Sequence, residues 1–131
     1  MGKGDIRGGH KMNYGLDLAG EKHGRRLEEL YDRTGLGDKL GIERQAFFCI
    51  MASDLLFHKV DLLYDFETNL VRTENIFHLS LSSSGERALV KLAFDLYGGN
   101  GEASPSKVFP YLDEEHARVA IAAIPIRYNI S

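Results

Sequence analysis

The first clear hydrophobic pattern in the chain lies between residues 21 and 34. Leu27, Leu30 and Tyr31 recur at the i, i+3, i+4 spacing of one helix face, whereas most of the positions between them are charged. Gly35 follows directly, and glycine is the usual residue where a helix ends in a left-handed conformation. The pattern therefore predicts an amphipathic helix over Glu21–Thr34.

The next segment is apolar around most of its circumference. A helix that is hydrophobic on nearly all sides is buried, so we expect a central helix here. It should begin near Asp38, which is a suitable N-cap residue. Its apolar residues are Ile42, Ala46, Phe47, Phe48, Cys49, Ile50 and Met51.

A third helix is predicted to end near Phe66. Ser53 or Asp54 can cap it, and Lys59 and Asp61 are expected to face water. Its apolar positions repeat at helical spacing: Leu56, Val60, Leu63 and Tyr64.

The period changes between Thr68 and Ser84. Apolar and polar residues alternate there, which predicts a short strand-like segment with one buried face. The apolar positions are Phe77, Leu79 and Leu81, and the polar ones are His78, Ser80 and Ser82.

Helical spacing returns after Ser83, and Ser83 and Glu86 have the spacing of a capping box. Arg87, Lys91 and Asp95 form the polar stripe that is left for solvent, with a favourable pair between Lys91 and Asp95. The Gly/Asn run at 98–101 ends the helix. The buried positions are Leu89, Val90, Leu92, Ala93, Phe94, Leu96 and Tyr97.

Two further helices are predicted near the C-terminus. Pro105 suits the first turn of a short helix through Val108 and Phe109. Asp113 can cap a last helix, in which Pro125 is expected to produce a kink or a stop. The apolar residues of that helix are Ala117, Val119, Ala120, Ile121, Ala123 and Ile124.

These patterns predict an all-α or nearly all-α fold of about five helices with one short extended segment. Residues 16–131 form a single domain with its core around residues 46–51 and 89–97. Residues 1–15 are interpreted as a flexible leader, because the first eleven residues contain four glycines and only Ile6 to bury. An expression tag followed by a natural start at Met12 would produce such a segment.

Charge and composition exclude several classes of function. The chain has 16 Lys+Arg and 19 Asp+Glu, a net charge of −3 with both signs interleaved, which disfavours nucleic acid as a partner. The one cysteine, Cys49, allows no intramolecular disulfide and fits a reducing cytoplasm. The longest apolar windows are too short to span a membrane. We therefore expect a cytoplasmic protein with no cofactor and an unknown protein or small-molecule partner.

The C-terminal half resembles a known family. It contains the run at residues 83–97, a Gly/Asn loop, Ser104-Pro105 leading to Val108-Phe109, and a helix ending Ile126-Arg127-Tyr128. With Leu16-Asp17-Leu18 and Tyr64-Asp65-Phe66, the chain resembles a family of small bacterial proteins known as a domain of unknown function. The resemblance covers nearly everything from Leu16 onward. It implies a compact, mainly helical fold and supplies no catalytic residues.

The histidines are the first candidates for chemistry. Asp54 with His58, and Asp113 with His116, have spacings that place two ligands on one helix face. Neither pair has the motif of a zinc hydrolase, and His23 fits the edge of the core. Whether His58, His78 and His116 converge depends on the fold. We expect no metal site.

The nucleophiles are equally weak candidates. Cys49 lies between Phe48 and Ile50, so we interpret it as an inert core residue. Ser82, Ser83 and Ser84 lack the Gly-x-Ser-x-Gly elbow of serine hydrolases. We therefore expect no catalytic residue and a non-enzymatic binding or interaction module.

One candidate site remains, at the start of the helix that follows Ser83. Serine hydroxyls, the permissive Gly85 and the guanidinium of Arg87 could together bind a phosphate or a carboxylate. The candidate residues are Ser83, Ser84, Gly85 and Arg87. Capping by Ser83 alone would explain the motif without a ligand, so the alternative is a small enzyme or ligand-sequestering protein that uses this site.

Overall fold

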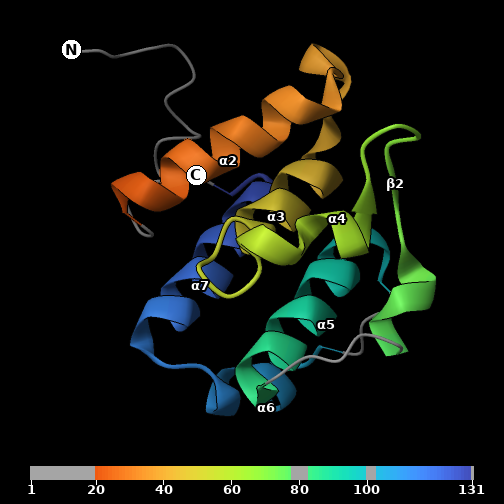
Figure 1. The fold of residues 1–131 in the computed structure, drawn as a ribbon. Helices are drawn as coiled ribbons and strands as arrows, with labels where there is room; N and C mark the ends of the chain where they lie inside the picture. Colours follow the sequence, from red (N-terminus) through yellow and green to blue (C-terminus); the bar gives the residue numbers. More distant parts are fainter. Residues whose placement is uncertain (1–19, 78–82, 100–102, 131) are drawn as a thin grey trace.

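The computed structural model describes residues 20–77, 83–99 and 103–130 (Figure 1). Residues 1–15 lie outside this range. The described α-helices are α2 (Glu21–Thr34), α3 (Gly41–Met51), α4 (Val60–Leu63), α5 (Ser84–Gly98), α6 (Pro105–Val108) and α7 (Glu114–Tyr128). Two short strands, β1 (Tyr64–Asp65) and β2 (Leu70–Val71), form the small sheet. The predicted mainly α-helical fold is confirmed.

Helix α2 has the predicted bounds. Gly35 ends it in the left-handed conformation, with its N–H donating to the Asp32 carbonyl oxygen at 3.1 Å. Leu27 and Leu30 are fully buried, as their spacing predicts. The sequence of this helix is therefore sufficient to place both its ends and its buried face.

The central helix α3 is confirmed, but Asp38 does not cap it. Asp38 lies in a separate 3₁₀ turn, η1 (Gly37–Lys39), and Leu40 precedes the first residue of α3. Gly37 and Gly41 both have positive φ, which lets the chain turn tightly between α2 and α3. The turn is set by glycines on either side of Asp38 rather than by its carboxylate.

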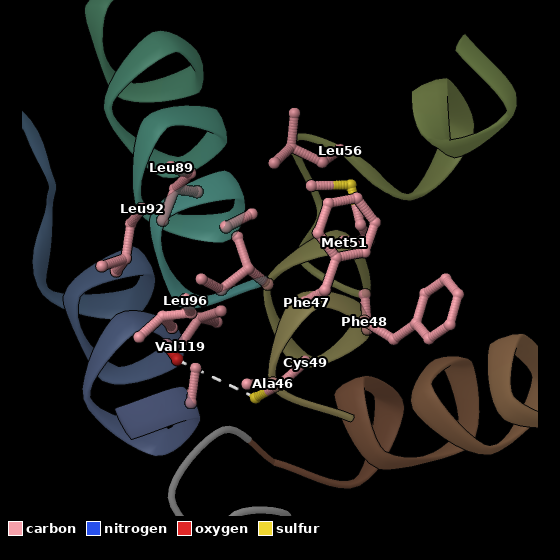
Figure 2. Packing of buried hydrophobic residues seen from close by; sticks show 14 of the residues in the cluster. Ala46, Phe47, Phe48, Cys49, Met51, Leu56, Leu89, Leu92, Leu96 and Val119 are labelled. Atoms are coloured by element: carbon pink, nitrogen blue, oxygen red, sulfur yellow. Dashed lines mark hydrogen bonds between the residues drawn. The ribbon is translucent and has the colours of Figure 1, made fainter. Parts of the chain in front are cut away.

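The core is built where α3 packs against α5 and α7. All six residues at 46–51 are completely buried. The ring of Phe47 lies edge-on to Phe48, Phe94 and Tyr97, with ring centroids 5.5–5.9 Å apart. Figure 2 shows α5 and α7 contributing Leu89, Leu92, Leu96 and Val119 to the same cluster. The predicted core around residues 46–51 and 89–97 is therefore correct.

The predicted third helix is largely wrong. Ser53 and Asp54 lie in turns, a 3₁₀ turn η2 follows at Phe57–Lys59, and only Val60–Leu63 is α-helical. The chain becomes extended at Tyr64, because β1 pairs antiparallel with β2 in the register Tyr64↔Val71.

Side-chain contacts fix this small hairpin onto the helices. Arg44 on α3 donates from Nε to the Tyr64 hydroxyl at 3.0 Å and from Nη2 to the Asn69 carbonyl oxygen at 2.9 Å. Asn69 has a φ of 58° and donates from Nδ2 to the Thr34 carbonyl oxygen at 3.0 Å. Two strands this short are not stable alone, so these tertiary contacts override the helical spacing.

The strand predicted between Phe77 and Ser82 is only partly covered by the structure. Phe77 is the last residue of a 3₁₀ helix, η3 (Thr73–Phe77), so the extended conformation is wrong at that position. The remaining residues of the segment, 78–82, lie outside the described residues.

Helix α5 begins and ends where its sequence predicts. The Ser83 side chain accepts a hydrogen bond from the Glu86 backbone N–H at 3.1 Å, and Gly99 provides the left-handed C-cap. The expected pair between Lys91 and Asp95 is absent from the ion pairs of the described residues. The Ser83 cap, by contrast, is confirmed.

Helices α6 and α7 also begin as predicted, with Pro105 in the first turn of α6 and Asp113 capping α7. Pro125, however, does not stop α7, which continues to Tyr128. Proline removes only its own N–H, and here only one turn remains after it. That turn is held on α5 by Arg127, whose Nε donates to the Leu96 carbonyl oxygen at 2.6 Å.

The helices are short in relation to a lipid bilayer. Among residues 20–77, 83–99 and 103–130, none forms a helix with the length and apolar character needed to cross a membrane.

Candidate functional site

A cation-lined groove lies between the first half of α5 and the α6 region. Its volume is about 300 Å³. We call it the basic groove, and it is lined by Ser84, Arg87, Ala88, Lys91, Ser106, Lys107 and Tyr111.

The α5 wall of the groove follows from helix geometry. Ser84, Arg87, Ala88 and Lys91 are spaced i, i+3, i+4 and i+7, so they share one face of the helix. Ala88 is buried at the base of this face, whereas the three polar side chains are exposed. The neighbouring face of the same helix is in the core, and this anchors the wall.

The opposite wall is a compact turn. Ser104 precedes α6, its hydroxyl lies 3.3 Å from that of Ser106, and its carbonyl oxygen accepts from the Lys107 N–H at 2.9 Å. Val108 is completely buried and fastens the turn to the core. The 3₁₀ turn η4 (Phe109–Tyr111) then leads to Tyr111.

The two walls approach closely at Gly85. A Cβ atom placed on Gly85 would lie 3.2 Å from the Tyr111 carbonyl oxygen, which is tighter than ordinary contact. Gly85 does not line the groove, but its missing side chain lets η4 pack directly against the start of α5. The width of the groove therefore depends on this glycine.

The charged side chains of the described residues that line the groove are all positive. Arg87, Lys91 and Lys107 line it, and no carboxylate of the described residues does. Lys91 and Lys107 form no ion pair with any other residue that the structure describes. Two serine hydroxyls add hydrogen-bond donors. Such a set of donors suits an anion, since charge-assisted hydrogen bonds are stronger than neutral ones.

The structure separates the four residues that the sequence grouped into one site. Ser84 and Arg87 line the groove, whereas Ser83 caps α5 and Gly85 contacts η4. Lys91 could have been found from its i+4 spacing to Arg87, but it was interpreted as a solvated position. The three contributors from the second wall carry no sequence signal that links them to α5: Ser106, Lys107 and Tyr111.

A buried charge pair lies behind the groove face of α5. Glu86 is only 2% exposed, and its carboxylate pairs with the ammonium group of Lys59 in η2. The sequence indicated a capping residue in Glu86 and a solvated lysine in Lys59. Lys59 is only partly solvated, with 32% of its side chain exposed, because the fold of residues 53–63 brings it onto α5.

The histidines and acidic residues do not gather into a metal centre. No group of three or more potential ligands occurs within the ranges that the structure describes. Asp54 pairs with Arg26, and His58 lies in η2, so these two do not share a helix face. His78 lies outside the described residues.

The histidines at the starts of α2 and α7 have structural partners. His116 Nδ1 is 2.7 Å from the Asp113 carboxylate. The Asp113 carboxylate also caps α7, and the hydrogen bonds from His116 lower its pKa. His23 is buried and donates from Nε2 to the Cys49 carbonyl oxygen at 2.6 Å, and burial lowers its pKa.

Cys49 is confirmed as a core residue. Its thiol is completely buried, with Sγ 4.0 Å from the Val119 carbonyl oxygen (Figure 2). Burial raises the pKa of the Cys49 thiol to about 12, so the thiolate form is disfavoured at neutral pH. It has neither the access nor the ionisation of a nucleophile.

Taken together, the described residues define a small, mostly α-helical domain with a basic groove on one side. The model of the "Family of unknown function (DUF6075)" matches residues 16–131. The chain therefore belongs to this family, which confirms the resemblance seen in its sequence. No curated protein matches the chain, and no solved structure matches it.

Proposed function

We propose that this protein is a non-enzymatic binding module whose ligand carries a phosphate or a carboxylate group. The observation that carries the proposal is the arrangement of Arg87, Lys91 and Lys107 around one groove of about 300 Å³. This volume is at the lower end of the range found for small-molecule sites. An anion in the groove would lie within reach of side chains that carry positive charge on both of its walls.

The composition of the groove favours binding over catalysis. General acid–base and nucleophilic mechanisms use histidine, carboxylate or cysteine side chains near the reacting atoms. Among residues 20–77, 83–99 and 103–130, none of these residue types lines the groove. Within the part of the chain that the structure describes, the serines Ser84 and Ser106 have no base beside them on the groove walls, which suits them to donate hydrogen bonds to a ligand rather than to attack it.

We also propose that the protein is bacterial and located in the cytoplasm. The buried, unpaired Cys49 supports a reducing compartment, where small metabolites with phosphate or carboxylate groups are abundant. Fractionation of the native host tests the location directly, and recovery outside the cytoplasm would contradict this part of the proposal.

A thermal-shift and calorimetric titration with inorganic phosphate and small dicarboxylates tests the proposed function. A ligand that binds only the folded state raises stability by about 2.7 kcal/mol at a concentration of 100 Kd. We expect Arg87→Ala and Lys107→Ala each to reduce this stabilisation. The matched control is Lys39→Ala, which removes an exposed positive charge in η1, far from the groove residues in the sequence.

The salt dependence provides a second readout. Since the groove is open to solvent, we expect binding to weaken between about 0.05 M and 0.5 M salt, because the Debye length shortens across this range. No stabilisation by any anion at low salt, or equal stabilisation of Arg87→Ala, Lys107→Ala and wild type, would contradict the proposal.

A further inference from the structure

The basic groove contains an aromatic residue whose role the charges do not explain. Tyr111 lines the groove and is 55% exposed. Large aromatic side chains bury much apolar area when they find a partner, so an exposed one beside a cluster of cations provides a surface for a planar group. The groove thus combines cationic and aromatic character.

The backbone that carries Tyr111 is held firmly. Leu112 donates its N–H to the Phe109 carbonyl oxygen at 3.1 Å, which closes the η4 turn. On the other side, the Tyr111 carbonyl oxygen lies against Gly85 of α5. A side chain on an ordered backbone turn costs less entropy on binding than one on a loose loop, because the backbone is already fixed.

The size of the groove limits the ligand. A volume of about 300 Å³ accommodates one charged group and one ring system rather than a polymer. The three cations come from both walls, Arg87 and Lys91 from α5 and Lys107 from α6. A ligand that satisfies the whole groove therefore has a compact anion joined to a planar ring.

We infer that the ligand of the basic groove is a mononucleotide, with its phosphate among Arg87, Lys91 and Lys107 and its base against Tyr111. This inference rests on the proposed anion-binding function and specifies its ligand class. The serine hydroxyls of Ser84 and Ser106 supply donors for the remaining phosphate and ribose oxygens. Stacking on one tyrosine tolerates any base, so the groove selects for a nucleotide but not for a particular base.

Calorimetric titration of the full chain with matched ligands tests the inference. The ligands are AMP, ribose 5-phosphate, adenosine and inorganic phosphate, each at low salt. We expect AMP to bind about 5- to 150-fold more tightly than ribose 5-phosphate, which corresponds to the 1–3 kcal/mol of one base stacked on an aromatic ring. Adenosine should bind more weakly than AMP, because it lacks the phosphate.

Three variants locate the contacts. Tyr111→Ala should reduce the affinity for AMP to that for ribose 5-phosphate, and Tyr111→Phe should retain the affinity for AMP. Arg87→Ala should weaken both phosphorylated ligands. Tyr128→Ala removes a similarly exposed tyrosine, 58% exposed at the end of α7, and should leave all affinities unchanged.

The outcomes distinguish the inference from the function on which it rests. Equal affinity for AMP, ribose 5-phosphate and phosphate, all lost in Arg87→Ala, would overturn the nucleotide and leave the anion site in place. No binding of any phosphate would overturn both. AMP binding that is unaffected by Tyr111→Ala and Arg87→Ala would place the nucleotide elsewhere and also overturn the inference. The four ligands are compared on the wild-type chain, so this comparison does not depend on any variant being folded.

Discussion

Helix α5 has two faces that meet different physical demands. On one face, Leu89, Leu92 and Phe94 are at most 5% exposed and pack against α3 and α7. On the other, Arg87 and Lys91 face the basic groove. The two faces share one backbone, one N-cap and one C-cap, so any difference between them comes from what their side chains contact.

The comparison separates stability from recognition within a single helix. The core face gains free energy from burial, which is large and insensitive to ionic strength. The groove face is exposed to solvent, where charged side chains contribute little to stability. We therefore expect substitutions on the core face to alter unfolding and substitutions on the groove face to alter binding.

The largest effect is expected in the core. Phe94→Ala should lower the free energy of unfolding by about 3–5 kcal/mol, and Leu92→Ala by about 2–5 kcal/mol, because each leaves a cavity in a fully packed cluster. Urea denaturation followed by circular dichroism measures both. Midpoints close to wild type would contradict the assignment of this face to the core.

The next effect concerns the charge buried on the core side of α5. Lys59→Met leaves the Glu86 carboxylate buried without its ammonium partner, and should cost about 1–3 kcal/mol of unfolding free energy. The control is Arg118→Met, which removes one partner of an exposed pair with Glu114 and should cost less than about 1 kcal/mol. Similar losses in both variants would show that the burial of Glu86 is unimportant.

The N-cap supports both faces, so its loss should have an intermediate effect. Ser83→Ala removes the acceptor of the Glu86 N–H and should cost about 0.5–2 kcal/mol. The control is Ser84→Ala, one residue later, whose side chain lines the groove. We expect that variant to unfold near the wild-type midpoint, and a larger loss for Ser84→Ala than for Ser83→Ala would contradict the division of roles.

A smaller, pH-dependent effect is expected at His23, the histidine buried on α2. Burial lowers its pKa from the ordinary value of 6.5, so below that pH the unfolded chain takes up a proton that the folded protein resists. Its contribution to stability is complete above pH 6.5 and declines as the pH falls through the window between 6.5 and the lowered pKa.

His23→Gln tests this effect, because it removes the titration and keeps an N–H donor for the Cys49 carbonyl oxygen. Wild type should lose more unfolding free energy than His23→Gln between pH 7.5 and pH 5.5, as measured from denaturation midpoints. His58→Gln, at an exposed position, is the control and should follow wild type. Equal pH dependence of wild type and His23→Gln would contradict the argument.

The smallest effect on stability is expected on the groove face. Arg87→Ala should change the unfolding free energy by less than about 0.5 kcal/mol in the absence of ligand, since exposed positions contribute little. The same variant should lose most of the stabilisation that phosphate confers on wild type. A large loss of stability without ligand would mean that Arg87 has a structural role, and the two faces of α5 would then not be separable.

The elements that could be predicted from sequence are those whose signals are local. The bounds of α2, the cap at Ser83, the cap at Asp113 and the burial of residues 46–51 each depend on spacing within one helix or on the residue at its end. In a helix of several turns with a clear apolar face, one atypical residue does not change the predicted element. These parts of the fold were therefore predicted correctly.

The segment from Ser53 to Val71 could not be predicted in the same way. The apolar spacing from Leu56 to Tyr64 is helical, but the chain is extended at Tyr64, where the hydroxyl accepts from Arg44 and the ring packs on Phe48. These partners are far away in sequence. The weak local preference for helix is overridden by long-range contacts, which no pattern within the segment records.

The candidate site divides along the same line. The sequence by itself determined that Ser84 and Arg87 lie together on one helix face, because helical spacing alone requires it. Only the tertiary structure decided that Lys107 and Tyr111 face them across a groove and that Lys59 pairs with Glu86. The physical reason is that packing of the core orients α5, α6 and η2 relative to one another. The distances between residues on different elements are not encoded in the spacing of residues along any single element.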